Sequence, residues 1–193
     1  MLKKIISRSR VLHLIRFSFL IIQVLLFSSC SNTTFHTKIA QYKSHEALSF
    51  PYKKKVVLVG GCFDVLHYGH INFLKNAKST GDILVVALES DESISLYKKR
   101  TPIHTQSQRA INLSAIKYVD HILLLPSLKG FKDYNQLVQD IKPDIIAVTA
   151  NDPQLKNKQI QADSINASLR IVIDRIDEFS TSKIVSNCTK SEM

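Results

Sequence analysis

The chain has 193 residues, of which 45% are hydrophobic and 22% are charged, as in an ordinary globular protein. This length favours one domain, and the composition excludes a wholly disordered, collagen-like or coiled-coil chain. A polytopic membrane protein is excluded too, because a single segment near the N-terminus is apolar enough to consider.

The formal net charge of +10 is concentrated at the N-terminal end. Residues 1–55 carry ten Lys and Arg and one acid, whereas residues 56–193 carry 16 basic and 15 acidic residues. Proteins that bind nucleic acid normally gather positive charge on their folded face. The nearly neutral body therefore predicts no nucleic-acid partner.

The three cysteines, Cys30, Cys62 and Cys188, are odd in number and form no CxxC pair. Neither a zinc site nor a disulfide framework follows from this pattern. We expect three free thiols in a reducing compartment and no metal site built from protein ligands.

Residues 1–30 form a signal-like or anchor-like segment. A basic start, the apolar run of residues 17–27 and small residues before Cys30 are typical of a bacterial lipoprotein signal, although Phe27 stands where such signals usually carry Leu. An organellar transit peptide and a translation start further downstream are the alternatives. Residues 31–54 show no apolar periodicity, and we interpret them as a linker.

The body from residue 55 alternates short apolar runs with segments of helical spacing. Such alternation predicts βαβ units and a parallel sheet covered on both faces. We therefore expect an α/β, Rossmann-like, doubly wound parallel five-stranded sheet, with a single domain over 55–186 and a tail over 187–193. The expected strands are 55–60, 82–88, 121–125, 144–148 and 169–173, and the expected helices are 68–78, 106–118 and 134–141.

The turn after the first strand carries the clearest chemistry. His67 and His70 are three residues apart at a predicted helix start, so both side chains lie on one face of the helix. A helix start offers free N–H groups to a phosphate, and Gly60 and Gly61 allow close approach of the backbone. This placement predicts a phosphate site. The alternative is a capped helix with two surface histidines.

The stretch GCFDVLHYGHINFLKNAKSTGD, residues 61–82, resembles the signature of the cytidylyltransferase-like nucleotidyltransferases, with its H-x-G-H element. Arg100 and Pro102, then residues 108–109, 115–120 and 175–184, follow the pattern of that family in the same order. The resemblance covers about residues 55–186. The chain resembles in particular the nucleotidyltransferase domain of ADP-heptose synthases and glycerol-3-phosphate cytidylyltransferase.

The resemblance implies that a phosphorylated small molecule attacks the α-phosphate of CTP or ATP, takes up CMP or AMP, and releases pyrophosphate. It also implies Mg²⁺ as cofactor and, by analogy, a homodimer. One alternative is an FMN adenylyltransferase that makes FAD. Another is a non-catalytic nucleotide-binding lipoprotein of the same fold.

The resemblance also assigns roles to residues. His67 and His70 would be catalytic, and Lys98, Lys99 and Arg100, in a flexible loop, would clamp the triphosphate. Arg109 is expected as an exposed arginine on a helix face. The residues expected to bind nucleotide are Gly61, Cys62, Phe63, Asp64, Gly69, Arg109, Asp152, Arg175, Ser180 and Thr181.

The chain departs from the family after the fourth strand. Relatives commonly carry a Gly-Asp pair there, whereas this chain has Asn151 and Asp152, so the glycine backbone is missing. Nucleoside triphosphates are cytosolic, and we therefore expect a cytoplasmic catalytic domain. The alternatives are membrane attachment or export through the N-terminal segment, or an organelle.

Overall fold

The computed structural model describes residues 33–34 and 38–174. Their centre is a six-stranded parallel sheet with the strand order β2-β6-β5-β4-β7-β8. Five of these strands are the predicted ones, and the Rossmann-like α/β class is confirmed. The strands are β2 (Ile39–Gln41), β4 (Val56–Gly61), β5 (Ile83–Leu88), β6 (His121–Leu124), β7 (Ile145–Thr149) and β8 (Ser168–Ile173).

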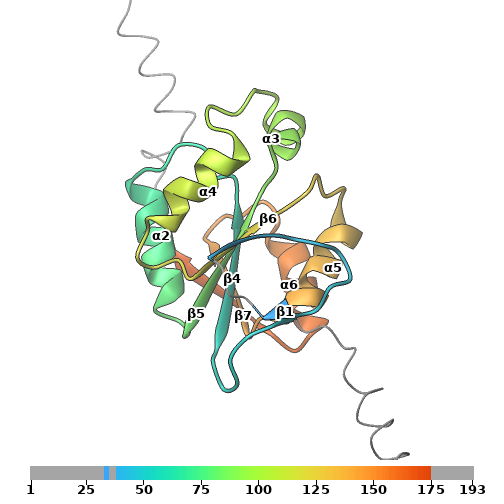
Figure 1. Cartoon of the computed structure of the whole chain (residues 1–193). Helices are drawn as coiled ribbons and strands as arrows, with labels where there is room; N and C mark the ends of the chain where they lie inside the picture. Colours follow the sequence, from blue (N-terminus) through green and yellow to red (C-terminus); the bar gives the residue numbers. More distant parts are fainter. Residues whose placement is uncertain (1–32, 35–37, 175–193) are drawn as a thin grey trace, which may run out of the picture. The chain divides into compact units, whose positions relative to one another are not determined.

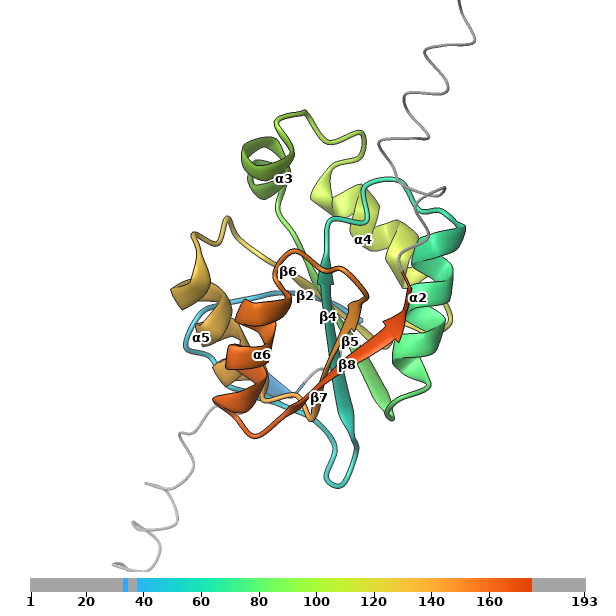
Figure 2. The ribbon, with the colours of Figure 1, turned by 180° about the vertical axis from the view of Figure 1, so that it is seen from behind.

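Two layers of helices cover the sheet. Figures 1 and 2 show α2 and α4 on one face and α5 and α6 on the other. Alternate residues of the central strands feed two cores, because successive side chains of a strand point to opposite faces. Val57 and Val59 join the core under α2 and α4, whereas Val56 and Leu58 join the core under α5 and α6. These helices are α2 (Tyr68–Lys78), α4 (Gln106–Ser114), α5 (Phe131–Ile141) and α6 (Leu155–Asp163).

The strand order reverses at β4. The chain runs from β4 outward through β5 and β6, and then crosses to β7 and β8 on the other side of β4. In open parallel sheets, ligands bind beyond the carboxyl ends of the strands at such a switch point. This edge carries the turn into α2 and the short helix α3 (Asp91–Lys98), which stands above the sheet in Figure 1.

Part of the segment predicted as a linker belongs to the domain. β2 pairs with β6, and the Tyr42 side chain that follows it is only 5% exposed. The Tyr42 hydroxyl donates to Asp140 Oδ2 at 2.7 Å, and Lys38 Nζ donates to the Ser114 carbonyl at 2.6 Å. The domain therefore begins before residue 55. Residues 33–34 and 48–49 form a separate pair of short strands, β1 (Thr33–Thr34) and β3 (Leu48–Ser49).

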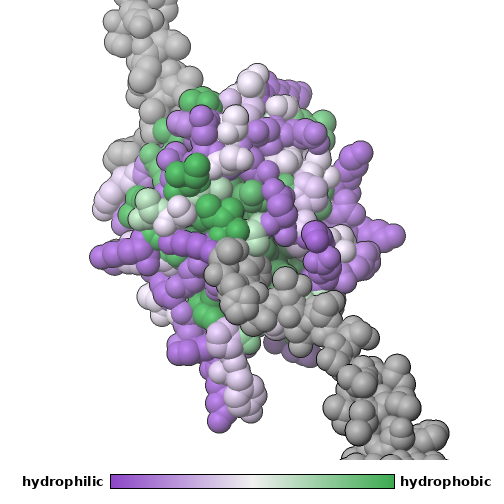
Figure 3. Space-filling model, viewed as in Figure 1, coloured by the Kyte–Doolittle hydropathy of each residue, from purple (hydrophilic) through white to green (hydrophobic). Residues whose placement is uncertain are grey.

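The helices differ from prediction in detail. α3 and α6 were not predicted, α4 ends at Ser114, and α5 begins at Phe131. None of the helices within residues 38–174 is long and apolar enough to cross a membrane. Figure 3 shows hydrophobic residues near the middle of one face, around α4, within a hydrophilic surround. The predictions for residues 1–30 and for the tail lie outside the described residues.

Candidate active site at the β4–α2 turn

The two histidines of the turn lie side by side. His67 is the N-cap of α2, with φ of −142°, and His70 lies in the first helical turn. Their ring centroids are 3.7 Å apart and the ring planes are 22° from parallel, so the rings are stacked. The spacing in the sequence predicted this shared face.

Both rings favour the neutral form. Burial lowers the pKa of His67, and burial together with the charge of His67 lowers the pKa of His70 to about 4, although the backbone of Val65 acts in the opposite direction. The Nδ1 atom of each ring is buried, without a hydrogen-bond partner of good geometry. Each neutral ring can donate one hydrogen bond to an anion beside the helix start.

Phe63 shapes the turn between β4 and the histidines. Its φ is +46°, a left-handed conformation that is unusual for a bulky residue and that clusters at functional sites. Its buried ring lies 5.0 Å from the His70 ring. A Cβ at residue 61 would lie 2.9 Å from the Phe63 ring, so Gly61 is needed to admit this ring.

Asp64 joins the turn to the loop before α4. Its carboxylate is 2% exposed, and it accepts hydrogen bonds from the backbone N–H groups of Ile103 and His104 and from Arg100 Nη1. Burial alone would raise the pKa of Asp64, but the bonds from His104, Arg100 and Ile103 together lower it. A carboxylate held by so many donors is a structural anchor for that loop.

The expectation of an exposed Arg109 is wrong. The side chain is fully buried, and each of its nitrogens donates to the protein. Its partners are the carbonyls of Cys62, His104 and Glu89, and the Asp91 carboxylate at 2.7 Å. Arg109 therefore ties together the ends of β4 and β5, α3 and α4, and direct contact with a phosphate stays a prediction that these bonds disfavour.

The predicted clamp residues lie at the same edge. Lys98 is the last residue of α3, Lys99 follows it with φ of +52°, and Arg100 is ion-paired to Asp64. Burial and the charge of Glu89 raise the pKa of the Cys62 thiol, whereas the charges of Lys98, Arg109 and Arg100 lower it. Arg100 and Arg109 contact the turn directly, through the Asp64 carboxylate and the Cys62 carbonyl. The raised pKa also leaves Cys62 a poor nucleophile.

Asn151 and Asp152, which stand where relatives commonly carry a Gly-Asp pair, lie between β7 and α6. Asn151 has φ of +61°, the conformation in which glycine is favoured and asparagine is tolerated. Asp152 accepts hydrogen bonds from the backbone of Gln154 and from Lys158 at 2.7 Å, at the start of α6. Asn151 therefore takes a backbone conformation that glycine also adopts readily.

Sequence reasoning missed Glu89 and Tyr134. Glu89 follows β5 directly, and its Oε1 accepts a 2.8 Å hydrogen bond from the Tyr134 hydroxyl of α5. The signal was available, because this acid comes directly after six apolar residues that are all buried. An acid at the carboxyl end of a central strand lies where ligands bind.

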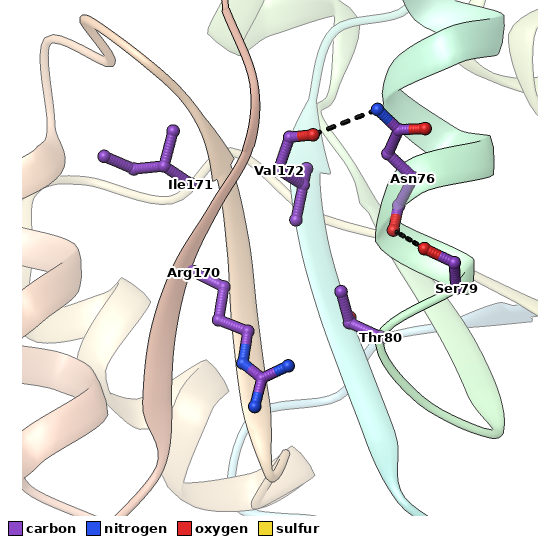
Figure 4. Close-up of a pocket in the computed structure, with 6 residues that line it drawn as sticks. All are labelled: Asn76, Ser79, Thr80, Arg170, Ile171 and Val172. Atoms are coloured by element: carbon purple, nitrogen blue, oxygen red, sulfur yellow. Dashed lines mark hydrogen bonds between the residues drawn. The ribbon is translucent and has the colours of Figure 1, made fainter.

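Other predicted residues are placed as follows. Gly69 is half-buried in the first turn of α2, and Arg175, Ser180 and Thr181 lie outside the described residues. Residues 38–174 contain no group of three or more His, Cys, Asp or Glu that could hold a metal ion. An open hollow of about 400 Å³ lies at the far end of α2, against β8, and is separate from the histidines (Figure 4).

The fold and the histidine turn define a nucleotidyltransferase of the α/β class. The chain belongs to the Cytidylyltransferase-like family, whose profile matches residues 58–187. This confirms the family to which the motifs pointed, and an enzyme that transfers nucleotidyl groups.

Two individual relatives are similar to most of this chain. The chain is 41% identical over 145 residues to the FAD synthase of Thermococcus kodakarensis, covering 72% of this chain and 95% of the relative. It is 36% identical over 169 residues to the bifunctional protein HldE of Campylobacter concisus, covering 87% of this chain. The match spans only 34% of HldE, about a third of its length.

A solved structure agrees with this fold. The lipopolysaccharide core biosynthesis protein from Thermoplasma volcanium is 29% identical, with a TM-score of 0.52, over 63% of this chain and 97% of that protein. The pantoate-beta-alanine ligase from Francisella tularensis is 18% identical with a TM-score of 0.52, over 75% of this chain and 73% of that one, and supports the fold alone.

Proposed function

We propose that the chain transfers AMP from ATP to FMN, forming FAD and releasing pyrophosphate. The observation that carries this proposal is the similarity to a FAD synthase over nearly the whole length of that relative. The first interpretation of the sequence, transfer of CMP or AMP to some other phosphorylated molecule, has less support than this alternative.

The chemistry needs positioning more than covalent catalysis. A phosphate oxygen of FMN attacks the α-phosphorus of ATP, and the bond from that phosphorus to the oxygen bridging to the β-phosphate breaks. The bond electrons leave with pyrophosphate, so no covalent enzyme intermediate forms. Charge grows on the transferred phosphoryl group, and preorganised hydrogen-bond donors stabilise it.

His67 and His70 are the proposed donors. A neutral imidazole carries one N–H, so each ring offers one hydrogen bond to an α- or β-phosphate oxygen. The positive end of α2 adds backbone N–H groups beside them. Burial holds the pKa values of both histidines low in the free protein. The negative charge of an approaching triphosphate would raise these pKa values and favour proton uptake on binding.

Mg²⁺ is the proposed cofactor. Asp64 and Asp152, two carboxylates of this edge, are already ion-paired to Arg100 and Lys158. Mg²⁺ usually keeps several waters and binds largely through substrate phosphates, so we expect it to arrive with the triphosphate and not in a site built from these two paired carboxylates. When bound, the ion would neutralise charge on the phosphates and on the leaving pyrophosphate.

The loop of residues 99–105 is the proposed phosphate clamp. It leaves α3 at Lys98 and is fastened at Asp64 through Arg100, Ile103 and His104. Lys98 and Lys99 are exposed at its start, and their ammonium groups would meet the triphosphate.

A sugar phosphate is the second candidate acceptor. Similarity to HldE over 87% of the chain favours it, and the same turn would serve the same transfer of AMP. The two acceptors share a phosphate and neighbouring hydroxyl groups, and differ in the flavin ring.

The experiment is a matrix of substrates with the full-length chain. Each of ATP, CTP, GTP and UTP is combined with FMN, a heptose phosphate or glycerol 3-phosphate, and pyrophosphate release is measured with identification of the product. We expect FAD from ATP and FMN at the highest kcat/KM. A higher value for a sugar phosphate would replace FMN by the second candidate.

A further inference from the structure

The central strand of the sheet is open to solvent at one point. Residues 56–59 of β4 are buried, but Gly60 is exposed although strands lie on both sides of β4. By alternation, Gly60 continues the face of Val56 and Leu58, which is the face of α5 and α6. A Cβ at residue 60 would meet no atom nearer than 3.9 Å, the Ala87 carbonyl oxygen. A ligand can therefore reach the backbone of β4 from this side.

Glu89 stands beside this opening. Its backbone N–H donates to the Gly61 carbonyl at 3.1 Å, and alternation along β5 directs its side chain to the same face as Val85 and Ala87. Oε1 is held by the Tyr134 hydroxyl, whereas Oε2 is buried and has no hydrogen-bond partner of good geometry. Leaving a buried carboxylate oxygen unpaired is unfavourable, and each such group calls for an explanation.

Burial and neighbouring charges act on the pKa of Glu89 in opposite directions. Burial raises the pKa of Glu89, while hydrogen bonds from Tyr134 and Ser93 and the charges of Lys158 and Arg109 lower it. Tyr134 and Ser93 thus orient the carboxylate, and Oε2, which has no partner of good geometry, is available to a neutral donor such as a hydroxyl group.

We propose that Glu89, oriented by Tyr134, determines acceptor specificity by binding hydroxyl groups of a polyol phosphate above Gly60. This inference rests on the proposed function. Direct transfer requires the acceptor phosphate to approach the α-phosphorus from the side opposite the leaving pyrophosphate. The histidines begin α2 on one face of the sheet, and Glu89 bonds Tyr134 of α5 on the other face, so Glu89 lies on the side left for the acceptor. The ribityl chain of FMN and a sugar phosphate both supply the required hydroxyl groups.

The test compares two acceptors in three proteins. FMN and a flavin phosphate whose ribityl hydroxyls are replaced by hydrogen are assayed with the wild type, Glu89→Gln and Glu92→Gln. Glu92 is an exposed acid of α3 and serves as the matched control. We expect the wild type and the control to prefer FMN by about 10- to 100-fold in kcat/KM, the range for a hydrogen bond to a charged group.

Glu89→Gln should lose most of this preference, with an unchanged KM for ATP. Its melting temperature should be equal to that of the wild type or higher, because an unpaired buried charge is removed. Tyr134→Phe keeps the carboxylate, should show an intermediate preference, and provides the same measurement if Glu89→Gln does not fold. A purely structural Glu89 would instead lower the melting temperature and leave the preference intact.

Two results would overturn the inference: full discrimination in Glu89→Gln, or a rise in the KM for ATP alone, which would assign Glu89 to the nucleotide ribose. Failure of the proposed function has a different signature, because the wild type would then make no FAD. The same comparison would in that case use a sugar phosphate and its deoxygenated analogue.

Discussion

Polar groups are bonded differently at the two ends of the parallel sheet. We call the end where the strands begin the amino edge and the end where they finish the carboxyl edge. At the amino edge, Asp82, Asp120 and Asp144 each stand directly before a strand and accept a backbone N–H at the start of the adjoining strand. The donors are Lys55 at 2.8 Å, Leu84 at 2.7 Å and Val56 at 2.7 Å. Lys78 adds an ion pair to Asp120. This edge fixes the register of the strands and leaves these carboxylates bound.

At the carboxyl edge, Asp64 and Arg109 are fully bonded, but other buried polar atoms lack hydrogen-bond partners of good geometry. Phe63 holds a left-handed backbone, and His67 Nδ1 and Glu89 Oε2 lack hydrogen-bond partners of good geometry. Strain and unpaired groups persist where a ligand later meets them. One edge of this sheet therefore serves stability, and the other carries the candidate active site.

Arg109→Ala should give the largest loss of stability, because the Arg109 side chain is fully buried and bonds three carbonyls and one carboxylate at the carboxyl edge. Removing a fully buried, multiply bonded guanidinium should lower the free energy of unfolding by about 3–5 kcal/mol. Denaturant unfolding measures this loss. Lys132→Ala, at an exposed position of α5, is the control and should stay within about 0.5 kcal/mol. A change as small as the control's would contradict the buried network.

Acid should lower the free energy of unfolding, because His70 at the carboxyl edge is buried in its neutral form. Burial lowers the pKa of His70 to about 4, so the unfolded chain takes up this proton first as pH falls. The stabilisation is full above about pH 6.5 and is lost towards pH 4, with a slope of at most about 1.4 kcal/mol per pH unit for one group. Thermal unfolding of His70→Asn should show a shallower decline over this window than the wild type. Equal slopes would mean that His70 is accessible and titrates normally.

Asp64→Asn should release the clamp loop while leaving the sheet intact. Loss of charge-assisted hydrogen bonds typically costs about 1.5–3 kcal/mol, and here the loop of residues 99–105 is what they hold. We expect a higher KM for ATP together with a moderately lower melting temperature. Steady-state kinetics and thermal unfolding on one preparation check both, and an unchanged KM would separate this loop from triphosphate binding.

Asp120→Ala should have the smallest effect and should act on stability alone. It removes one hydrogen bond to the Leu84 N–H and a partly exposed ion pair with Lys78, which together contribute about 1–2 kcal/mol. kcat and KM should match those of the wild type. Impaired turnover in a folded Asp120→Ala would break the division between the two edges.

Apolar runs and motif spacing were enough to predict much of the fold and the shared face of the two histidines. The runs at β4, β5, β6, β7 and β8 are short, β-branched and bounded by turns, so their burial follows from local sequence. The facing of His67 and His70 follows from helical geometry alone.

What escaped prediction depends on contacts distant in sequence. β2 has three residues and no apolar run, and it is held through Tyr42 and Asp140, which are 98 positions apart. α6 is largely polar, with Gln161 and Ala162 as its buried residues. Arg109 is buried because carbonyls from three separate segments converge on it, and no local spacing reveals such convergence.

Turnover and thermal unfolding of His70 variants test the central claim most directly. With ATP and FMN, His70→Ala should lower kcat by about 10²–10³, the effect of removing one donor to developing charge, while the KM for ATP changes little. His70→Asn should recover part of the rate because its amide still donates. Full kcat per folded molecule in a destabilised His70→Ala would contradict the account and leave His70 a structural residue.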